Sequence, residues 1–169
     1  MVPGMISGMD LQKALSNPEI SPTKILNLIN VHYLIDTDIC VFFLKGKFGL
    51  NQKIKKVGIE NCYLSEITIA EPKYGAVKSN NPKHFKEVEN IEELFHIPPI
   101  YNSLEKYAYE RVRLEKLGLR IPDFDLLIGV SAVNNDMILV SNNERHLARV
   151  ENLKLENWTK LENNTYANT

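Results

Sequence analysis

Short apolar runs alternate with longer segments of helical character along most of the chain, and this alternation constrains the fold more than any other feature. The apolar runs predict strands at residues 32–35, 61–64, 137–140 and 153–156, with a fifth candidate at 95–97. The segments between them predict helices at residues 38–45, 50–57, 68–78, 83–94, 103–117 and 123–134, and a short one from residue 143. We therefore predict an α/β fold with a mostly parallel central sheet of four to five strands and helices on both faces.

The chain divides into three parts by composition. Residues 1–30 are turn-rich and predict an N-terminal appendage that is partly disordered, residues 31–160 carry the alternating elements of one folded domain, and residues 161–169 form a polar tail. Hydrophobic residues make up 44% of the 169 positions, which is enough to bury a core.

Charge and cysteine usage exclude several classes of protein. The formal net charge is -1, so a nucleic-acid partner must be held by local basic patches and not by a global field. Cys40 and Cys62 lie in apolar settings without a CxxC pair, which predicts reduced, buried thiols in a cytoplasmic protein. No apolar run approaches the roughly 20 residues of a membrane span, and we expect neither a signal peptide nor membrane association.

Acidic and amide residues stand where apolar elements end or begin. Asp36 follows the first strand, Asp125 lies at the start of a helix, and Ser141 and Asn143 follow a later strand. The carboxyl ends of parallel strands meet at one crevice, where ligands bind. Carboxylates gathered there repel one another unless a cation neutralises them, so the pattern predicts a divalent-metal site.

The candidate site consists of Asp36, Glu71, Asp125 and the Ser141-x-Asn143 pair. Mg²⁺ and Mn²⁺ favour hard oxygen ligands, and three carboxylates with an amide can hold one or two such ions while leaving room for water. Hydrolytic nucleases need such an arrangement, because the metal activates water and stabilises charge on the phosphodiester.

Five segments in order also resemble one family. They are LIDTDICVFFLKG at 34–46, LSEITIAEPKYG at 64–75, DFDLLIG at 123–129, VSNN at 140–143 and LENW at 155–158. Together they are similar to PIN-domain proteins of the VapC toxin type, over about residues 33–160. The resemblance implies a PIN-like fold and a Mg²⁺-dependent endoribonuclease, with Mn²⁺ able to substitute. It implies the toxin half of a type II toxin–antitoxin pair, a homodimer that acts on RNA and is inhibited by a small VapB-like antitoxin. It assigns the metal and catalytic roles to Asp36, Glu71 and Asp125, with Asp123, Ser141, Asn143 and Thr37 in support.

The sequence departs from that family at three places. Residues 1–30 have no counterpart, Ser141 replaces the usual threonine, and Pro72 replaces a helix-forming residue. Proline in a helix interior costs about 3 kcal/mol. The cost applies if the helix starts at Ser65, and is milder if Thr68 is the cap. One alternative function is therefore a weakened PIN-like protein that binds RNA or an antitoxin without cutting.

A second alternative is a haloacid-dehalogenase-like phosphatase, because Asp36-Thr37-Asp38 follows a strand. In that family, however, the acidic pair comes after the Ser/Thr motif, whereas Asp123 and Asp125 come before Ser141.

Each site residue also has an ordinary structural role to weigh. Asp36 could cap the next helix, Glu71 could close a capping box with Thr68, and Asn143 could cap the last short helix. Asp123 is the expected cap of its helix, with Asp125 facing the crevice. Asp38 is expected to be a solvated first-turn acid, and the four histidines, which lack metal-ligand spacing, are expected to be structural. Two basic clusters offer phosphate contacts, without individual assignments: Lys45, Lys47, Lys53, Lys55 and Lys56, and Arg111, Arg113, Lys116 and Arg120.

Overall fold

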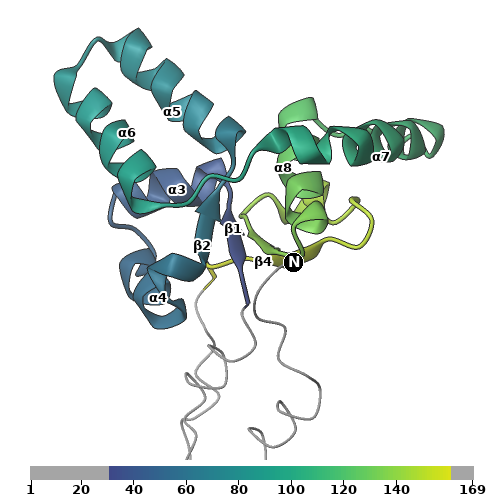
Figure 1. Ribbon diagram of the computed structural model, residues 1–169, viewed down its shortest axis with the longest axis horizontal. Helices are drawn as coiled ribbons and strands as arrows, with labels where there is room; N and C mark the ends of the chain where they lie inside the picture. The colour runs from purple at the N-terminus through teal and green to yellow at the C-terminus, as the bar shows by residue number, and fades with distance from the viewer. Residues whose placement is uncertain (1–30, 161–169) are drawn as a thin grey trace, which may run out of the picture.

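Four short parallel strands form the centre of the protein in the computed structural model, which describes residues 31–160 (Figure 1). The strands are β1 (Tyr33–Ile35), β2 (Cys62–Leu64), β3 (Ile138–Val140) and β4 (Lys154–Glu156), arranged in the order β2-β1-β3-β4. The expectations for residues 1–30 and 161–169 lie outside the described residues.

Seven α-helices surround the sheet within the described range. They are α3 (Thr37–Leu44), α4 (Leu50–Val57), α5 (Glu66–Ser79), α6 (Pro82–Leu94), α7 (Leu104–Lys116), α8 (Asp123–Asn134) and α9 (Glu144–Leu147), with 3₁₀ turns at Ile59–Asn61 and Ile100–Ser103. Helices α5 and α6 pair as a hairpin that extends away from the sheet, and α7 extends on the opposite side (Figure 1). No helix in residues 31–160 is long and apolar enough to cross a membrane.

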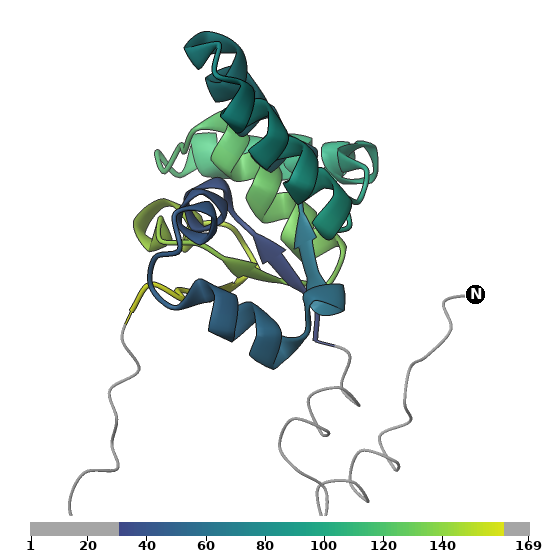
Figure 2. The same cartoon turned by 90° about the vertical axis from the view of Figure 1, so that its left-hand side faces the viewer.

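The core lies on both faces of the sheet, because successive strand side chains point to opposite sides. Tyr33 and Ile35 of β1 pack with α3, α4 and Trp158 in one cluster. Leu34 and Leu139 pack with α8 and α9 in another, and Figure 2 shows the sheet between these layers. The predicted α/β fold with helices on both faces is therefore confirmed, and Trp158 is buried in the core. Cys40 and Cys62 are buried free thiols, and burial raises the pKa of each to about 12.

The fifth candidate strand, at residues 95–97, does not form. It is reduced to a single bridge in which the Leu64 N–H donates to the His96 carbonyl at 3.0 Å. Pro98 and Pro99 follow directly, and because proline has no N–H the ladder cannot continue.

Helix α5 begins two residues before the predicted start. Ser65 is its N-cap, and the Ser65 hydroxyl accepts the Thr68 N–H at 2.9 Å. The milder alternative for Pro72, a position in the first turn, is therefore wrong, since Pro72 lies in the helix interior. The helix nevertheless continues through Pro72 to Ser79, and it packs against α6.

Candidate active site

A pocket of about 270 Å³ opens at the carboxyl ends of β1 and β3. Its lining residues are Asp36, Thr37, Asp38, Glu71, Phe124, Asp125, Ile128 and Asn143. The three carboxylates expected to act together come from three different elements: Asp36 from the end of β1, Glu71 from α5 and Asp125 from the first turn of α8. The fold thus brings together side chains that lie up to 89 positions apart in the chain.

Asp36 is the most buried carboxylate of the pocket, with 7% of its surface exposed. One carboxylate oxygen, Oδ1, accepts the Thr37 N–H at 2.7 Å, so Asp36 does cap α3. The other, Oδ2, accepts the Ser141 hydroxyl at 2.6 Å. Burial raises the pKa of Asp36 to about 6, with the charge of Asp38 adding to the effect and the Ser141 hydrogen bond opposing it. The Asp36 side chain therefore both caps α3 and lines the pocket.

Asn143 occupies the N-cap position of α9, but its side chain faces Asp125 and does not cap the helix. Its Nδ2 donates to Asp125 Oδ2 at 2.7 Å, while its backbone N–H donates to the Ser141 hydroxyl at 2.9 Å. No side-chain cap bond is formed at this helix start. Of the two roles left open for Asn143, the structure therefore shows the one in the pocket.

Neighbouring groups shift the pKa of Asp125 in both directions. Burial raises its pKa and the charge of Glu71 adds to this, whereas His146 and the Asn143 amide lower it. His146 Nδ1 lies 3.8 Å from Asp125 Oδ2. The sequence predicts a structural role for His146, and the one local signal for its proximity to Asp125 is its place one helical turn after Asn143.

Asp38 is a second residue that sequence reasoning missed. It is half-buried and not a freely solvated first-turn acid: Oδ1 accepts the Ile39 N–H at 2.7 Å, and Oδ2 accepts the Asn142 N–H at 3.1 Å. Burial raises its pKa. The available signal was the Asp36-x-Asp38 spacing at a strand–helix junction, which brings a first-turn side chain back over the strand end.

Glu71 is an exposed residue on the rim of the pocket. The capping box proposed for it does not form, because Ser65 and Thr68 make the cap one turn earlier. The interior position of Pro72 does not remove Glu71 from the pocket, and the Glu71 charge still acts on Asp125.

Asp123 does not line the pocket, and its expected role as a cap is wrong. It is the first residue of α8, after Pro122, and makes no side-chain cap bond. Its Oδ1 accepts the Tyr107 hydroxyl at 3.1 Å and pairs with Arg111 Nη1 at 2.9 Å, both on α7. Asp123 therefore ties α8 to α7, while Asp125, two residues further along, faces the pocket.

The donor set fits a divalent cation in its chemistry. Four carboxylates (Asp36, Asp38, Glu71 and Asp125) line the pocket without a lysine or arginine among the described lining residues. The Thr37 hydroxyl is buried there and makes no hydrogen bond within the described part of the chain. Carboxylate, amide and hydroxyl oxygens are ligands for Mg²⁺ or Mn²⁺. In residues 31–160 no three acidic, histidine or cysteine side chains are grouped closely enough to coordinate one ion as they stand. Repulsion between like charges keeps the carboxylates apart. The residues of the pocket therefore fit a divalent cation by the type of their donor atoms, and they do not form a closed coordination shell.

Comparison with known proteins gives one consistent result. A family model for the PIN domain matches residues 33–153. Ribonuclease VapC2 of Haemophilus influenzae is 33% identical over 131 residues, which cover 75% of this chain and 97% of that protein. The tRNA(fMet)-specific endonuclease VapC of Shigella flexneri is 29% identical over 136 residues, covering 75% and 98%. The crystal structure of VapBC2 from Rickettsia felis, bound to a DNA fragment from their promoter, superposes with a TM-score of 0.71 at 30% identity and covers 76% of this chain and 99% of that one.

Proposed function

This chain belongs to the PIN-domain family, among its VapC-type members, and from that premise we propose that it is a metal-dependent endoribonuclease and the toxin of a VapBC-type module. The observation that carries the proposal is the convergence of Asp36, Glu71 and Asp125 on one pocket at the carboxyl end of the sheet. Names of relatives supply the reaction class, since both VapC2 of Haemophilus influenzae and VapC of Shigella flexneri are described as RNA-cleaving enzymes.

Asp36, Asp125 and Glu71 would hold Mg²⁺ or Mn²⁺, and Asp38 lines the same pocket. When bound, such a cation supplies Lewis acidity, which lowers the pKa of water and offsets negative charge on the phosphodiester. Ser141 orients Asp36 and Asn143 orients Asp125, each through a hydrogen bond of 2.6–2.7 Å. Thr37 offers its unpaired hydroxyl beside them.

RNA can approach this acidic pocket only when its charge is compensated. Four carboxylates repel phosphate, and the chain as a whole carries a net charge of -1. Substrate binding therefore depends on the cation and on lysines and arginines outside the pocket. Phe124, which is 54% exposed at the pocket edge, offers an aromatic face on which an unpaired base can stack.

The proposed setting is a cytoplasmic toxin–antitoxin module. The solved structures of Rickettsia felis VapBC2 and of nontypeable Haemophilus influenzae VapBC-1, at 30% and 25% identity, are VapBC structures. A small VapB-like antitoxin is accordingly the proposed partner, and a homodimer is the proposed form of the toxin.

The test is cleavage of total RNA and of transfer RNA by purified, antitoxin-free protein, with Mg²⁺ or Mn²⁺ compared against EDTA. We expect metal-dependent cuts that are lost in Asp36→Asn. Cleavage that persists in EDTA, or in a folded Asp36→Asn variant, would refute the mechanism.

One observation favours a second candidate function, a PIN-like protein that binds RNA or antitoxin without cutting. It is the interior position of Pro72, directly beside Glu71. Binding without cleavage by the wild-type chain, together with cleavage by Pro72→Leu, would establish it. A phosphatase is set aside, because the chain belongs to the PIN-domain family.

A further inference from the structure

One three-residue loop after β3 holds three pocket carboxylates at once. Each of its residues donates one hydrogen bond to a different carboxylate. The pairs are Ser141 Oγ with Asp36 Oδ2 at 2.6 Å, the Asn142 N–H with Asp38 Oδ2 at 3.1 Å, and Asn143 Nδ2 with Asp125 Oδ2 at 2.7 Å. The loop therefore links carboxylates from three places in the fold: the end of β1 (Asp36), α3 (Asp38) and α8 (Asp125).

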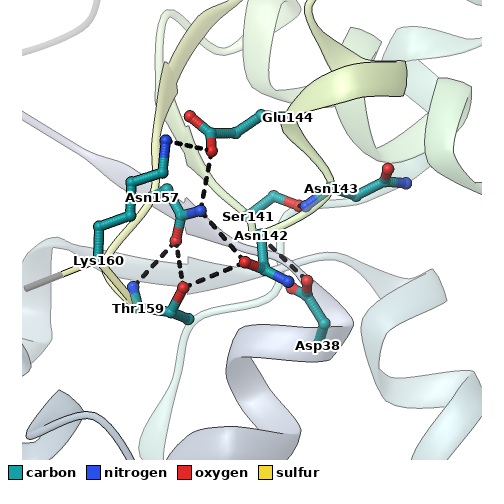
Figure 3. A network of polar contacts seen from close by, with 8 residues as sticks. All are labelled: Asp38, Ser141, Asn142, Asn143, Glu144, Asn157, Thr159 and Lys160. Atoms are coloured by element: carbon teal, nitrogen blue, oxygen red, sulfur yellow. Dashed lines mark hydrogen bonds and ion pairs between the residues drawn. The ribbon is translucent and has the colours of Figure 1, made fainter.

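The loop is held from its other side by the segment that follows β4 (Figure 3). Asn157 Nδ2 donates to Asn142 Oδ1 at 3.2 Å and to Glu144 Oε2 at 3.0 Å. The single proton of the Thr159 hydroxyl is shared between Asn157 Oδ1 at 2.7 Å and the same Asn142 oxygen at 3.1 Å. Lys160 pairs with Glu144 at 2.6 Å. Asn157 is thus the side chain in this network that bonds to residues on both sides of Asn143.

The segment that carries Asn157 is itself fixed to the sheet. The Ser141 N–H donates to the Glu156 carbonyl at 3.0 Å, so loop and segment are joined where β4 ends. Next to Asn157, Trp158 is buried, and its ring packs on Tyr33 of β1 with the centroids 5.1 Å apart. Asn157 Oδ1 also accepts the Thr159 N–H at 2.9 Å, which shapes the turn. A donor fixed to the sheet therefore meets the loop at Asn142, which is an exposed residue.

We propose that Asn157 is a positioning residue of the candidate active site. Through the Asn142 side chain it holds the backbone N–H that binds Asp38, and thereby keeps the Asp38 carboxylate turned to the pocket. The Asn157–Asn142 contact lies outside the pocket, so its effect reaches the site only through the loop. A role of Asn157 in catalysis rests on the proposed function, but the Asn157–Asn142 contact and its effect on the loop can be tested without RNA.

The experiment is a double-mutant cycle with Asn157→Ala, Asn142→Ala and the double variant. Asn90→Ala, at an exposed position of α6, is the matched control. The first readout is backbone hydrogen exchange at position 142 in metal-free protein, with the amide of Leu139 in the buried strand β3 reporting global stability. The second is the Kd for Mn²⁺, measured by electron paramagnetic resonance on the same proteins.

We expect either single substitution to speed exchange at position 142 by about five- to tenfold, the size of one hydrogen bond. The Kd for Mn²⁺ should rise by about tenfold, while Leu139 exchange and the control stay unchanged. The Asn157–Asn142 hydrogen bond is the contact that both substitutions remove. The effect of the double variant on exchange at position 142 should therefore be smaller than the product of the two single effects.

Unchanged exchange at position 142, or effects of the two substitutions that multiply, would overturn the proposal. So would faster exchange with an unaltered Kd, since Asn157 would then shape the turn without positioning the site. A wild-type chain that binds no Mn²⁺ and cuts no RNA would refute the proposed function and the catalytic meaning, and the exchange result would still decide whether the contact holds the loop.

Discussion

Replacing Asp36 by asparagine should stabilise the protein while removing its activity. Asp36 is 7% exposed and lies near Asp38 and Asp125, so its ionised form is disfavoured in the folded state. The displacement of its pKa from 3.8 to about 6 corresponds to about 3 kcal/mol of destabilisation once the carboxylate is charged. Asparagine removes this charge.

Asparagine keeps the shape of the side chain but replaces one acceptor by a donor. If its oxygen continues to accept the Thr37 N–H, its NH₂ group faces the Ser141 hydroxyl, which already accepts the Asn143 N–H. The Ser141 O–H then loses its acceptor, and the loss of this hydrogen bond costs about 1 kcal/mol. We therefore expect Asp36→Asn to raise the free energy of unfolding by about 2 kcal/mol at pH 7 in metal-free buffer.

The gain should depend on pH in a defined direction. Below pH 3.8 Asp36 is protonated in both states and imposes no penalty. Between pH 3.8 and about 6 the unfolded state releases the proton first, so wild-type stability falls as pH rises, and above about 6 the penalty is complete. Urea unfolding of both proteins with EDTA, at pH 7 and at pH 4, measures the difference. A variant that is less stable than wild type at pH 7, or a difference that does not shrink toward pH 4, would refute the reasoning.

Three further predictions concern the same site. Mg²⁺ should raise the Tm of wild type, measured by scanning calorimetry, more than that of Asp36→Asn, because the variant lacks one of the charged carboxylates proposed to hold the cation in the folded state; equal shifts would count against a ligand role for Asp36. Asn143→Ala should weaken Mn²⁺ binding by about 10- to 100-fold in a fluorescence or resonance titration while urea unfolding shows a folded protein, and an unchanged affinity would remove Asn143 from the site. Pro72→Ala should raise the free energy of unfolding by up to about 3 kcal/mol and leave the rate of RNA cleavage within a few-fold of wild type, since Glu71 already lies on the pocket; a large gain in rate would instead identify the wild-type chain as a weakened enzyme.

The fold could be predicted from the sequence because its strands and helices differ in period. The four strands that form lie within one residue of the expected ranges, and the range 50–57 was matched fully by α4. The strand predicted at residues 95–97 does not form, because a short apolar run carries no information about its hydrogen-bond partners. The two prolines that follow end the ladder.

The site was predictable in its members more than in its contacts. Asp36, Glu71 and Asp125 could be grouped because strand ends and helix starts converge in a parallel sheet, and all three line one pocket. The difference between Asp123 and Asp125 could not be read from the chain. This difference depends on Tyr107 and Arg111 of α7, which bind the Asp123 carboxylate outside the pocket.

The Asp36-x-Asp38 spacing could have placed Asp38 near the end of the strand, but the hydrogen-bond partners of Asp38 and Asn157 could not be predicted. Each is assigned by a partner more than 14 positions away, Asn142 in both cases, and nothing local marks the pairing. Polar networks of this kind are specified by the packed fold and not by sequence periodicity.

The most direct test of the central claim compares Asp125→Asn with Asp123→Asn in a Mg²⁺-dependent RNA cleavage assay. Both substitutions replace a carboxylate by an amide in the same turn of α8, but of the two residues only Asp125 lines the pocket. We expect Asp125→Asn to lower the cleavage rate by at least about 100-fold, and Asp123→Asn, which loses a partly exposed contact to α7, to stay within a few-fold of wild type. Equal losses in the two variants, or full activity in a folded Asp125→Asn protein, would contradict the assignment of the pocket as the catalytic site.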